Sequence, residues 1–326
     1  MRRRDFLAAI AAATACSPPA RAAQRRDPVI GYLYAGSLGA NPDSGEAFWK
    51  GLAELGYVKG RNVEVEYREA RNDLTRLPDL ARDLVRREVS VIYVPGSGPA
   101  VFAAKAATAT IPIVFANAGD PLRLGYVASL SRPDGNVTGI SDFGIDLSAK
   151  RLELIRLLVP AVSRVGILVT RGYPGIAREV ENARKSAPAL SLETVVSVVG
   201  NQQEIDAAFA AFAQDRVDGV CVVPSPVFAD RRAHLVELAA RYRLPAIYPF
   251  IQFPRSGGLM SYGISLAERA YQAGRYIGLI LEGAKPSDLP VHRLSRFELV
   301  LNRSTATALG LTVPARFLAL TDEVIE

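Results

Sequence analysis

Residues 96–100, Gly-Ser-Gly-Pro-Ala, combine residue types that can bind an anion. They follow an apolar run and enter a predicted helix, whose first position suits Pro99 and whose cap suits Ser97 or Gly98. Free N–H groups and a partial positive charge at a helix start can hold a carboxylate. The segment therefore offers Ser97, Gly98 and Ala100 as candidate ligand-binding residues, with an ordinary capped turn as the alternative.

Polar and aromatic side chains also follow several other apolar runs. Ligands of open α/β sheets bind where the strands end, so these side chains are candidates for ligand contact. Tyrosine rings could stack on an aromatic or aliphatic ligand, and an arginine could pair with a carboxylate. The candidates are Ser37, Asn117, Asp120 and Ser141 in the first half of the chain and Arg171, Tyr173, Ser225, Tyr248 and Tyr262 in the second.

The signatures of common catalytic sites are missing from the sequence. No G-x-G-x-x-G follows the first apolar run, and no Walker A, G-x-S-x-G or H-E-x-x-H pattern occurs. The two histidines, His234 and His292, lie far apart. Asp120, Asp142 and Asp146 could form a carboxylate set, but caps and turns at strand ends are the better interpretation. We therefore predict a protein that is not an enzyme and that needs no metal or cofactor.

The elements that would position the candidate residues form two series of alternating strands and helices. Apolar runs separated by helices are typical of parallel strands buried on both faces. We predict an α/β protein of two Rossmann-like lobes, with the ligand in a cleft between them. The first series has strands at 29–35, 62–69, 89–95 and 111–116 and helices at 44–55, 74–88 and 99–107; the second has strands at 164–170, 191–198, 217–224, 244–250 and 258–263 and helices at 148–160, 174–187, 203–213 and 230–243.

The order of these elements predicts how the chain divides into lobes. Residues 28–141 form lobe 1 and residues 142–264 form lobe 2. A helix at about 266–282 and a strand at 297–302 are left over, and they fit if the chain crosses back. The segment from about 265 to 326 therefore belongs in part to lobe 1, and the alternative is that another part of it belongs to lobe 2. We expect hinges near 139–143, 261–265 and 284–296.

The first 22 residues have the pattern of an export signal. Arg3 and Arg4 precede Asp-Phe-Leu, as in the twin-arginine pattern, and an apolar run too short to span a bilayer follows. The small-residue site at 20–22 suits a signal peptidase. We predict a twin-arginine signal peptide at 1–22 and a periplasmic protein, with a lipid anchor at Cys16 as the alternative.

Composition limits the class of partner. The 326 residues are 49% hydrophobic and 22% charged, and the net charge of +6 falls to +3 without the leader, which holds four arginines and one aspartate. The other arginines are scattered among acids, which indicates solvated faces and no nucleic-acid partner. Cys221 stands in an apolar run, so we predict a buried and inert thiol. We expect a monomer that binds a small-molecule solute.

Several long strings of the sequence carry a family resemblance. One of them is DPLRLGYVASLSRPDGNVTGIS, which ends at Ser141. They resemble ABC-transporter substrate-binding proteins of the tryptophan/tyrosine type, from about residue 28 to the C-terminus. The resemblance implies a type I periplasmic binding protein that captures a small solute and passes it to an ABC permease and ATPase in the inner membrane. The strings lie at 51–70, 111–141, 150–155, 257–314 and 322–326.

The resemblance also implies how a ligand is held. Family members are similar in binding amino acids, several of them aromatic or hydrophobic, with the carboxylate on backbone and hydroxyl groups of lobe 1. Carried over here, these groups belong to residues 96–100 and 117–120. Two departures affect the ligand: Arg171 lies where relatives often have Asn-Pro, and Ser265 stands where an acid in relatives could pair with an ammonium group. An amino acid and an amine-free aromatic or branched acid are therefore both candidate ligands.

A second class of function also fits an exported binding protein. The same architecture serves in ligand-sensing proteins that feed a sensor kinase or chemoreceptor. Import through a permease is the function that the resemblance favours, and sensing is the alternative.

Overall fold

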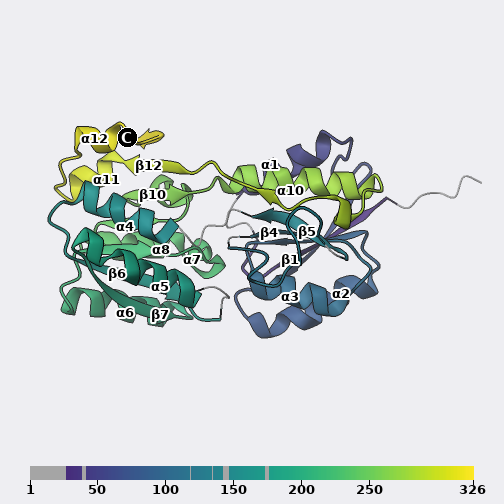
Figure 1. The fold of residues 1–326 in the computed structure, drawn as a ribbon, viewed down its shortest axis with the longest axis horizontal. Helices are drawn as coiled ribbons and strands as arrows, with labels where there is room; N and C mark the ends of the chain where they lie inside the picture. The colour runs from purple at the N-terminus through teal and green to yellow at the C-terminus, as the bar shows by residue number, and fades with distance from the viewer. Residues whose placement is uncertain (1–26, 39–41, 118, 134, 142–146, 173–175) are drawn as a thin grey trace, which may run out of the picture.

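Two α/β lobes lie side by side and are joined by segments that cross between them (Figure 1). The computed structural model describes residues 27–38, 42–117, 119–133, 135–141, 147–172 and 176–326. Each lobe is built on one sheet, and nearly all neighbouring strands are parallel. The predicted two-lobed α/β fold is confirmed. Lobe 1 below means the first sheet with its helices, and lobe 2 means the second.

The sheet of lobe 1 has its strands in the order β11-β5-β4-β3-β1-β2, all parallel. Helices α1 and α10 cover one face, and α2 and α3 cover the other (Figure 1). The strands are β1 (Val29–Tyr34), β2 (Glu64–Glu69), β3 (Val91–Pro95), β4 (Ile113–Asn117), β5 (Val137–Ser141) and β11 (His292–Arg293). The helices are α1 (Pro42–Ala53), α2 (Leu77–Arg86), α3 (Gly98–Ala107) and α10 (Leu266–Leu281), with short 3-10 turns η1 (Leu74–Arg76) and η4 (Pro286–Asp288).

The sheet of lobe 2 has the order β13-β12-β10-β9-β8-β6-β7, and β12 runs antiparallel to β10. The strands are β6 (Arg164–Thr170), β7 (Glu193–Val199), β8 (Gly219–Val222), β9 (Ala246–Tyr248), β10 (Met260–Gly263), β12 (Glu298–Asn302) and β13 (Glu323–Ile325). The helices are α4 (Leu147–Leu158), α5 (Ile176–Ser186), α6 (Gln202–Gln214), α7 (Pro226–Asp230), α8 (Arg232–Arg241), α9 (Gln252–Arg255), α11 (Arg303–Ala308) and α12 (Ala315–Leu318), with a 3-10 turn η3 (Pro188–Leu190).

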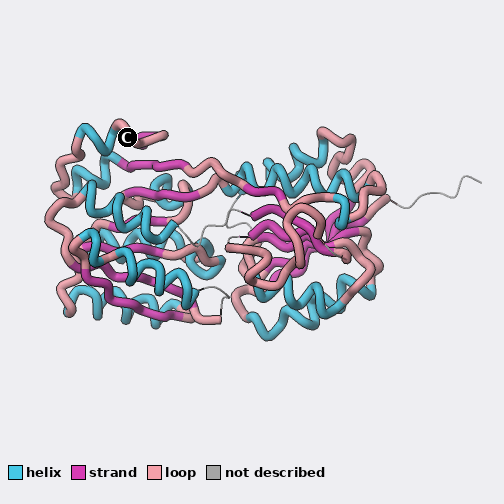
Figure 2. The backbone as a smooth tube through the Cα atoms, viewed as in Figure 1, coloured by secondary structure: helices cyan, strands magenta, loops and turns pink. Residues whose placement is uncertain are grey.

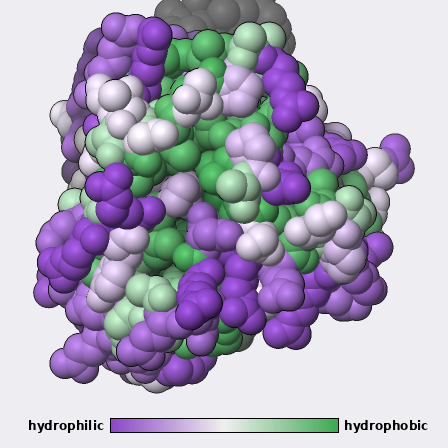
Figure 3. Space-filling view, turned by 90° about the vertical axis from the view of Figure 1, so that its left-hand side faces the viewer, coloured by the Kyte–Doolittle hydropathy of each residue, from purple (hydrophilic) through white to green (hydrophobic). Residues whose placement is uncertain are grey.

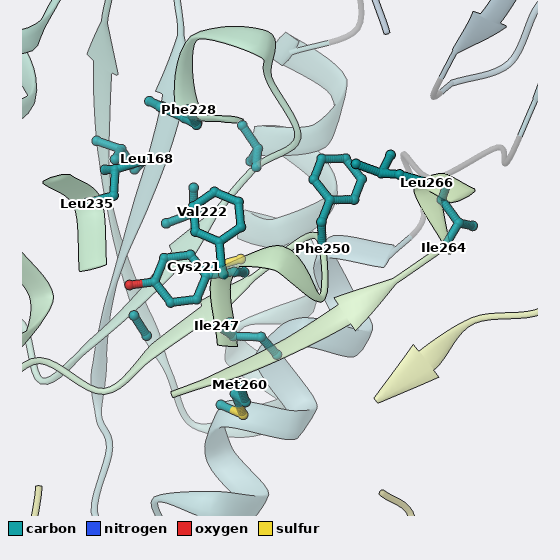
Figure 4. Packing of buried hydrophobic residues seen from close by; sticks show 14 of the residues in the cluster. Leu168, Cys221, Val222, Phe228, Leu235, Ile247, Phe250, Met260, Ile264 and Leu266 are labelled. Atoms are coloured by element: carbon teal, nitrogen blue, oxygen red, sulfur yellow. The ribbon is translucent and has the colours of Figure 1, made fainter. Parts of the chain in front are cut away.

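The apolar runs of the sequence form the cores of the lobes. In lobe 2, side chains from β6, β8 and β9 meet those of α7 and α8, as Leu168, Phe228 and Ile247 show (Figure 4). Cys221 is fully buried among them, as predicted, and burial raises the pKa of its thiol to about 12. At the end of this core, Phe250 lies beside residues of the second crossing, so packing continues from lobe 2 toward α10 (Figure 4).

Helix α10 is held against α1 by very close backbone contact. A Cβ atom on Gly51 would lie 2.1 Å from the carbonyl oxygen of Tyr271, and one on Gly274 would lie 2.2 Å from that of Phe48. Real Cβ atoms do not approach so closely, so only glycine allows this packing. The contact fixes α10, which follows a lobe 2 strand in sequence, firmly in lobe 1.

The chain crosses between the lobes three times (Figure 2). The first crossing joins Ser141 at the end of β5 to Leu147 at the start of α4, so it falls on 142–146, outside the described residues. The second is at 264–265, between β10 and α10, and the third is at 294–297, between β11 and β12. Residues 139–141, predicted as part of the first crossing, belong instead to β5.

The outer end of lobe 2 shows no single kind of surface. Hydrophobic residues there are interspersed with hydrophilic ones (Figure 3). Exposed apolar residues of this kind are common on proteins, and we assign them no role. None of the described helices is long and apolar enough to cross a membrane.

Candidate functional site

The predicted anion-binding turn forms the start of α3. Gly96 has a positive φ of 67°, and Ser97, which is fully buried, is the cap residue. The Ala100 N–H donates to the Ser97 hydroxyl at 3.3 Å, and the Val101 N–H donates to the Ser97 carbonyl. Because Pro99 has no N–H, Gly98 supplies the one donor of this first turn that is without a partner among the described residues. The turn is therefore a narrower anion site than the sequence suggests.

Asn117, at the end of β4, is the most unusual polar residue of lobe 1. It is only 2% exposed, and neither polar atom of its amide has a hydrogen-bond partner. Alternation along the strand places it on the same face as Phe115, toward α3 and Tyr126. Burial raises the pKa of Tyr126 to about 12, although the adjacent Asn117 amide acts to lower it, so a neutral phenol borders the amide without forming a hydrogen bond of good geometry to it. A buried amide without partners costs free energy, which makes Asn117 the clearest candidate for contact with a ligand.

Asn117 and Ser97 lie at the same edge of the sheet. The Gly96 N–H donates to the carbonyl of Ala116 at 2.9 Å, so the turn before α3 is level with the end of β4. Ser141 is paired in register with Asn117 on the neighbouring strand, and its hydroxyl donates to the Gly119 carbonyl at 2.5 Å. The structure therefore brings three of the predicted residues together at the ends of three adjacent strands.

Asp120 caps a turn. Its Oδ1 accepts hydrogen bonds from the N–H groups of Leu122 and Arg123, at 3.0 and 3.4 Å, and its Oδ2 pairs with the Arg123 guanidinium at 3.3 Å. All of these partners lie in the same loop. The interactions match the interpretation of Asp120 as a turn residue.

In lobe 2, Ser225 and Thr170 form a buried hydroxyl pair at the ends of neighbouring segments. The Thr170 hydroxyl donates to that of Ser225 at 3.0 Å, and the Ser225 oxygen accepts from the Val227 N–H at 3.1 Å. Arg171, which follows Thr170, pairs with Glu204 of the same lobe at 3.1 Å and is 65% exposed. The described pairing thus holds the guanidinium against lobe 2 and away from Ser97 and Asn117.

The three predicted tyrosines have different surroundings. Tyr248 is fully buried in the core of lobe 2, and its ring stacks on Phe253 with centroids 4.5 Å apart. Burial raises the pKa of Tyr248 well above its usual value. Tyr262, in β10, is half-buried, and its ring centroid lies 6.1 Å from that of Phe297, which is in the third crossing. Tyr173 lies outside the described residues.

Asp230, the last residue of α7, joins the two lobes. Its Oδ2 accepts hydrogen bonds from the Ser37 N–H at 2.9 Å and from the Asn72 side-chain amide at 2.8 Å. These donors lie in the loops after β1 and β2, in lobe 1. Ser37 is therefore a site residue through its backbone, with a partner that the sequence did not indicate.

Two other contacts between the lobes flank this one. Arg255 of α9 approaches Asp43 of α1 at 3.4 Å, with both side chains about half exposed. A Cβ atom on Gly172 would lie 3.2 Å from the Leu74 side chain, so the segment after β6 touches the 3-10 turn η1 that follows β2. The strand ends of the two lobes are therefore in contact in this structure.

A cavity of about 620 Å³ lies elsewhere, between α1, α10 and the third crossing. Its walls include Lys50, Ser265, Tyr271, His292 and Arg296. None of the predicted ligand-binding residues that the structure describes is among its lining residues. The polar groups at the strand ends, and not this cavity, are the better candidate for the ligand site.

Sequence reasoning missed Asp230 and Asn72. The sequence predicts one helix over 230–243, whereas α7 ends at Asp230 and a separate helix begins at Arg232. No motif marks Asp230, because its role depends on where the two lobes meet. Asn72 carried a weak signal: it has a positive φ of 66°, which asparagine tolerates better than most residues, in a loop after a strand.

Two mostly parallel sheets whose carboxyl ends face each other, with three crossings and buried polar groups at those ends, define a type I periplasmic binding protein fold. The chain belongs to the ABC transporter substrate binding protein family, whose sequence model matches residues 43–325. Proteins of this family are extracytoplasmic binders of small molecules that work with ABC transporters.

Individual relatives agree with this membership. A tyrosine-binding protein of Clostridioides difficile (strain R20291) is 28% identical over 267 residues, which is 82% of this chain and 76% of that protein. The crystal structure of an ABC domain from Streptococcus pneumonia in complex with L-Trp is 27% identical, with a TM-score of 0.83 over 92% of this chain and 100% of that one. A conserved domain protein from Vibrio cholerae is 25% identical, with a TM-score of 0.84 over 91% of this chain and 99% of that one.

Proposed function

We propose that this protein is the solute receptor of an ABC importer. It binds a small carboxylate-bearing solute, an amino acid or an aromatic or branched acid, between its lobes and delivers it to a permease and ATPase in the inner membrane. The observation that carries the proposal is the buried Asn117 amide without partners at the edge of lobe 1 that faces lobe 2. The relatives that bind tyrosine and L-Trp support the ligand class.

The carboxylate of the solute would bind at the start of α3. The Gly98 N–H and the Asn117 amide can each donate a hydrogen bond, and the positive end of the helix favours a negative charge there. Hydrogen bonds to charged groups contribute about 1.5–3 kcal/mol each. Two of them, with one buried apolar side chain, contribute about 4.5–9 kcal/mol before the cost of association, so micromolar affinity, about −8 kcal/mol, also needs further contacts from the second lobe.

Closure of the lobes around the solute would be the mechanism of capture. Arg151 of α4 is buried, and its Nε donates to the Tyr262 carbonyl at 2.9 Å. The bond connects the helix after the first crossing to the strand before the second. It makes the lobe 2 side of two crossings one rigid unit, so rotation is confined to the short segments between the lobes. A solute that touches both lobes binds the closed state more tightly and shifts the population toward it.

A ligand panel tests this proposal. Tryptophan, tyrosine, phenylalanine, aromatic acids and branched short acids would be added to the mature protein, with thermal unfolding and calorimetry as readouts. A ligand at 100 times its dissociation constant should stabilise the fold by about 2.7 kcal/mol. L-Tryptophanamide, which lacks the carboxylate, is the matched control and should have little effect. An unchanged melting temperature with every acid on the panel would contradict the ligand class.

Export by the twin-arginine pathway and release into the periplasm complete the proposal. The signal at 1–22 and the alternative anchor at Cys16 both lie outside the described residues. Mass spectrometry of the N-terminus of the protein made in its own cell distinguishes them. Cleavage after Ala22 supports the soluble form, and a lipid-modified Cys16 contradicts it.

A further inference from the structure

The Asp230 carboxylate is only half satisfied by its partners across the interface. Oδ2 has two neutral donors, the Ser37 N–H and the Asn72 amide. Oδ1 is buried and has no hydrogen-bond partner. No arginine, lysine or histidine among the described residues forms an ion pair with Asp230. Asp230 as a whole is half-buried, but its Oδ1 atom is enclosed, and enclosed polar atoms of proteins nearly always have a hydrogen-bond partner, so a partner from outside the chain is expected here.

A second unsatisfied acceptor belongs to the same group. The Oδ1 atom of Asn72 is also buried and without a partner, while its Nδ2 is fixed by the bond to Asp230. The bond through Nδ2 thus fixes the orientation of the amide and leaves its oxygen without a hydrogen-bond donor. Two acceptor oxygens without partners, one from an amide and one from a carboxylate, on side chains that hydrogen-bond to each other, are suited to a cationic N–H donor. An ammonium group has three such donors.

This pair of acceptors lies close to the proposed carboxylate site. Ser37 follows β1 and Ser97 follows β3, and these strands are neighbours, which places their ends about 4.8 Å apart. A Cβ atom on Gly36 would lie 3.1 Å from the Asp230 Oδ1 and 2.9 Å from the ring of Tyr34, and one on Gly96 would lie 3.9 Å from the other edge of that ring. Acceptors and anion-binding donors therefore lie on two sides of one tyrosine.

We infer that Asp230, together with Asn72, binds the ammonium group of the solute, and that the solute is an α-amino acid and not an amine-free acid. The inference rests on the proposed function and narrows its ligand class. An α-amino acid carries its carboxylate and its ammonium group on one carbon, so it needs an acceptor and a donor at neighbouring strand ends. Asp230 at the end of β1 and the Gly98 N–H after β3 meet this requirement. An amine-free acid would leave the Asp230 Oδ1 unpaired and would place a second negative charge near it.

Because Asp230 reaches from lobe 2 to lobe 1, it would also connect recognition with closure. The carboxylate arrives at the ligand only when α7 is against the loops after β1 and β2. The ammonium group then gains its charged partner only in the closed state, which is the differential affinity that closure requires.

Calorimetry with matched ligands tests the inference. The wild-type protein would be titrated with L-tryptophan and L-tyrosine and with their deaminated analogues, indole-3-propionate and 3-(4-hydroxyphenyl)propionate. We expect the better amino acid to bind about 10- to 150-fold more tightly than its analogue, the range for hydrogen bonds to a charged group. In Asp230→Asn the affinity for the amino acid should fall by a similar factor, and the affinity for the analogue should change by less than about threefold.

Arg255→Gln is the control, because it removes another described polar contact between the lobes, to Asp43, together with the Arg255–Glu323 pair within lobe 2. It should affect the amino acid and its analogue alike. Equal losses for both ligands in Asp230→Asn would show that Asp230 only holds the lobes together, and would overturn the inference. Wild-type protein that binds the analogue as tightly as the amino acid would overturn it without any variant, and would leave the proposed function intact. Binding of neither class would contradict the proposed function and this inference with it.

Discussion

Replacing Asn117 by leucine should change stability and binding in opposite directions. The two side chains have similar branched shapes, so the substitution exchanges a polar group for an apolar one with little change in volume. The wild-type amide is 2% exposed, and both of its polar atoms are unpaired. A buried unsatisfied polar group costs about 1–3 kcal/mol. We therefore expect Asn117→Leu to stabilise the ligand-free protein by about 1 kcal/mol or more.

The same substitution should weaken the ligand complex. If the amide donates to the solute carboxylate, its loss removes a hydrogen bond to a charged group, at about 1.5–3 kcal/mol. This corresponds to about a 10- to 150-fold increase in the dissociation constant. Urea unfolding without ligand measures the first effect, and calorimetry with the best ligand of the panel measures the second.

Tyr126→Phe is the matched control for this experiment. It removes the phenol that borders the Asn117 amide and keeps the amide itself. Binding to Tyr126→Phe should stay near the wild-type value. If Asn117→Leu instead loses more than about 1 kcal/mol of stability and binds normally, the amide has a structural partner and is not reserved for a ligand.

Three further results are expected. In α1, Gly45→Ala should stabilise the protein by about 0.5–1 kcal/mol, because the added Cβ atom would meet no atom within 4 Å. Gly51→Ala should destabilise it by about 1–3 kcal/mol, because the added Cβ atom would lie 2.1 Å from a carbonyl oxygen of α10. Urea unfolding compares the two variants, and equal effects would contradict the close packing of α1 on α10. The hydrogen bond from the Leu38 N–H, with other groups, lowers the pKa of Glu69 below its usual 4.5. The ionised Glu69 therefore contributes to the free energy of unfolding above pH 4.5, and this contribution is lost as the pH falls through the lowered pKa. Measurements of unfolding from pH 7 to 3 should show this loss in the wild type and not in Glu69→Gln. Cys221, with a pKa raised to about 12, should resist iodoacetamide until the protein is unfolded, and labelling of the folded protein would show that it is accessible.

The sequence predicts most of the fold because its signals are local. Apolar runs predict the buried strands, and the cap residue and proline near residue 98 predict the start of α3 to within one residue of where it is observed. The strands that it did not predict are short or weakly apolar. β5 includes Gly139, where a Cβ would lie 2.1 Å from the Phe115 carbonyl, so packing there demands a residue of low strand propensity. β11 has only two residues, and only its pairing with β5 makes it a strand.

The candidate site is less accessible to sequence reasoning. Ser97 and Asn117 could be found, because strand ends in parallel sheets share an edge. Which polar atoms are already used could not be read from the sequence: the Ala100 N–H is taken by Ser97, and Arg171 is paired with Glu204. Asp230 could not be found at all, because its partners are 158 and 193 residues away in the chain.

The triple crossing between the lobes also sets the order in which they can be completed during synthesis. The first sheet lacks its edge strand until His292 and Arg293 have been made, and the second lacks β13 until Ile325 has been made. At ribosomal rates of about 5–20 residues per second, β1 waits roughly 15–50 s for β11. During most of that time α10 is also missing, so α1 alone covers that face of the sheet. The growing chain therefore carries a partly uncovered apolar surface until Leu281 has been made.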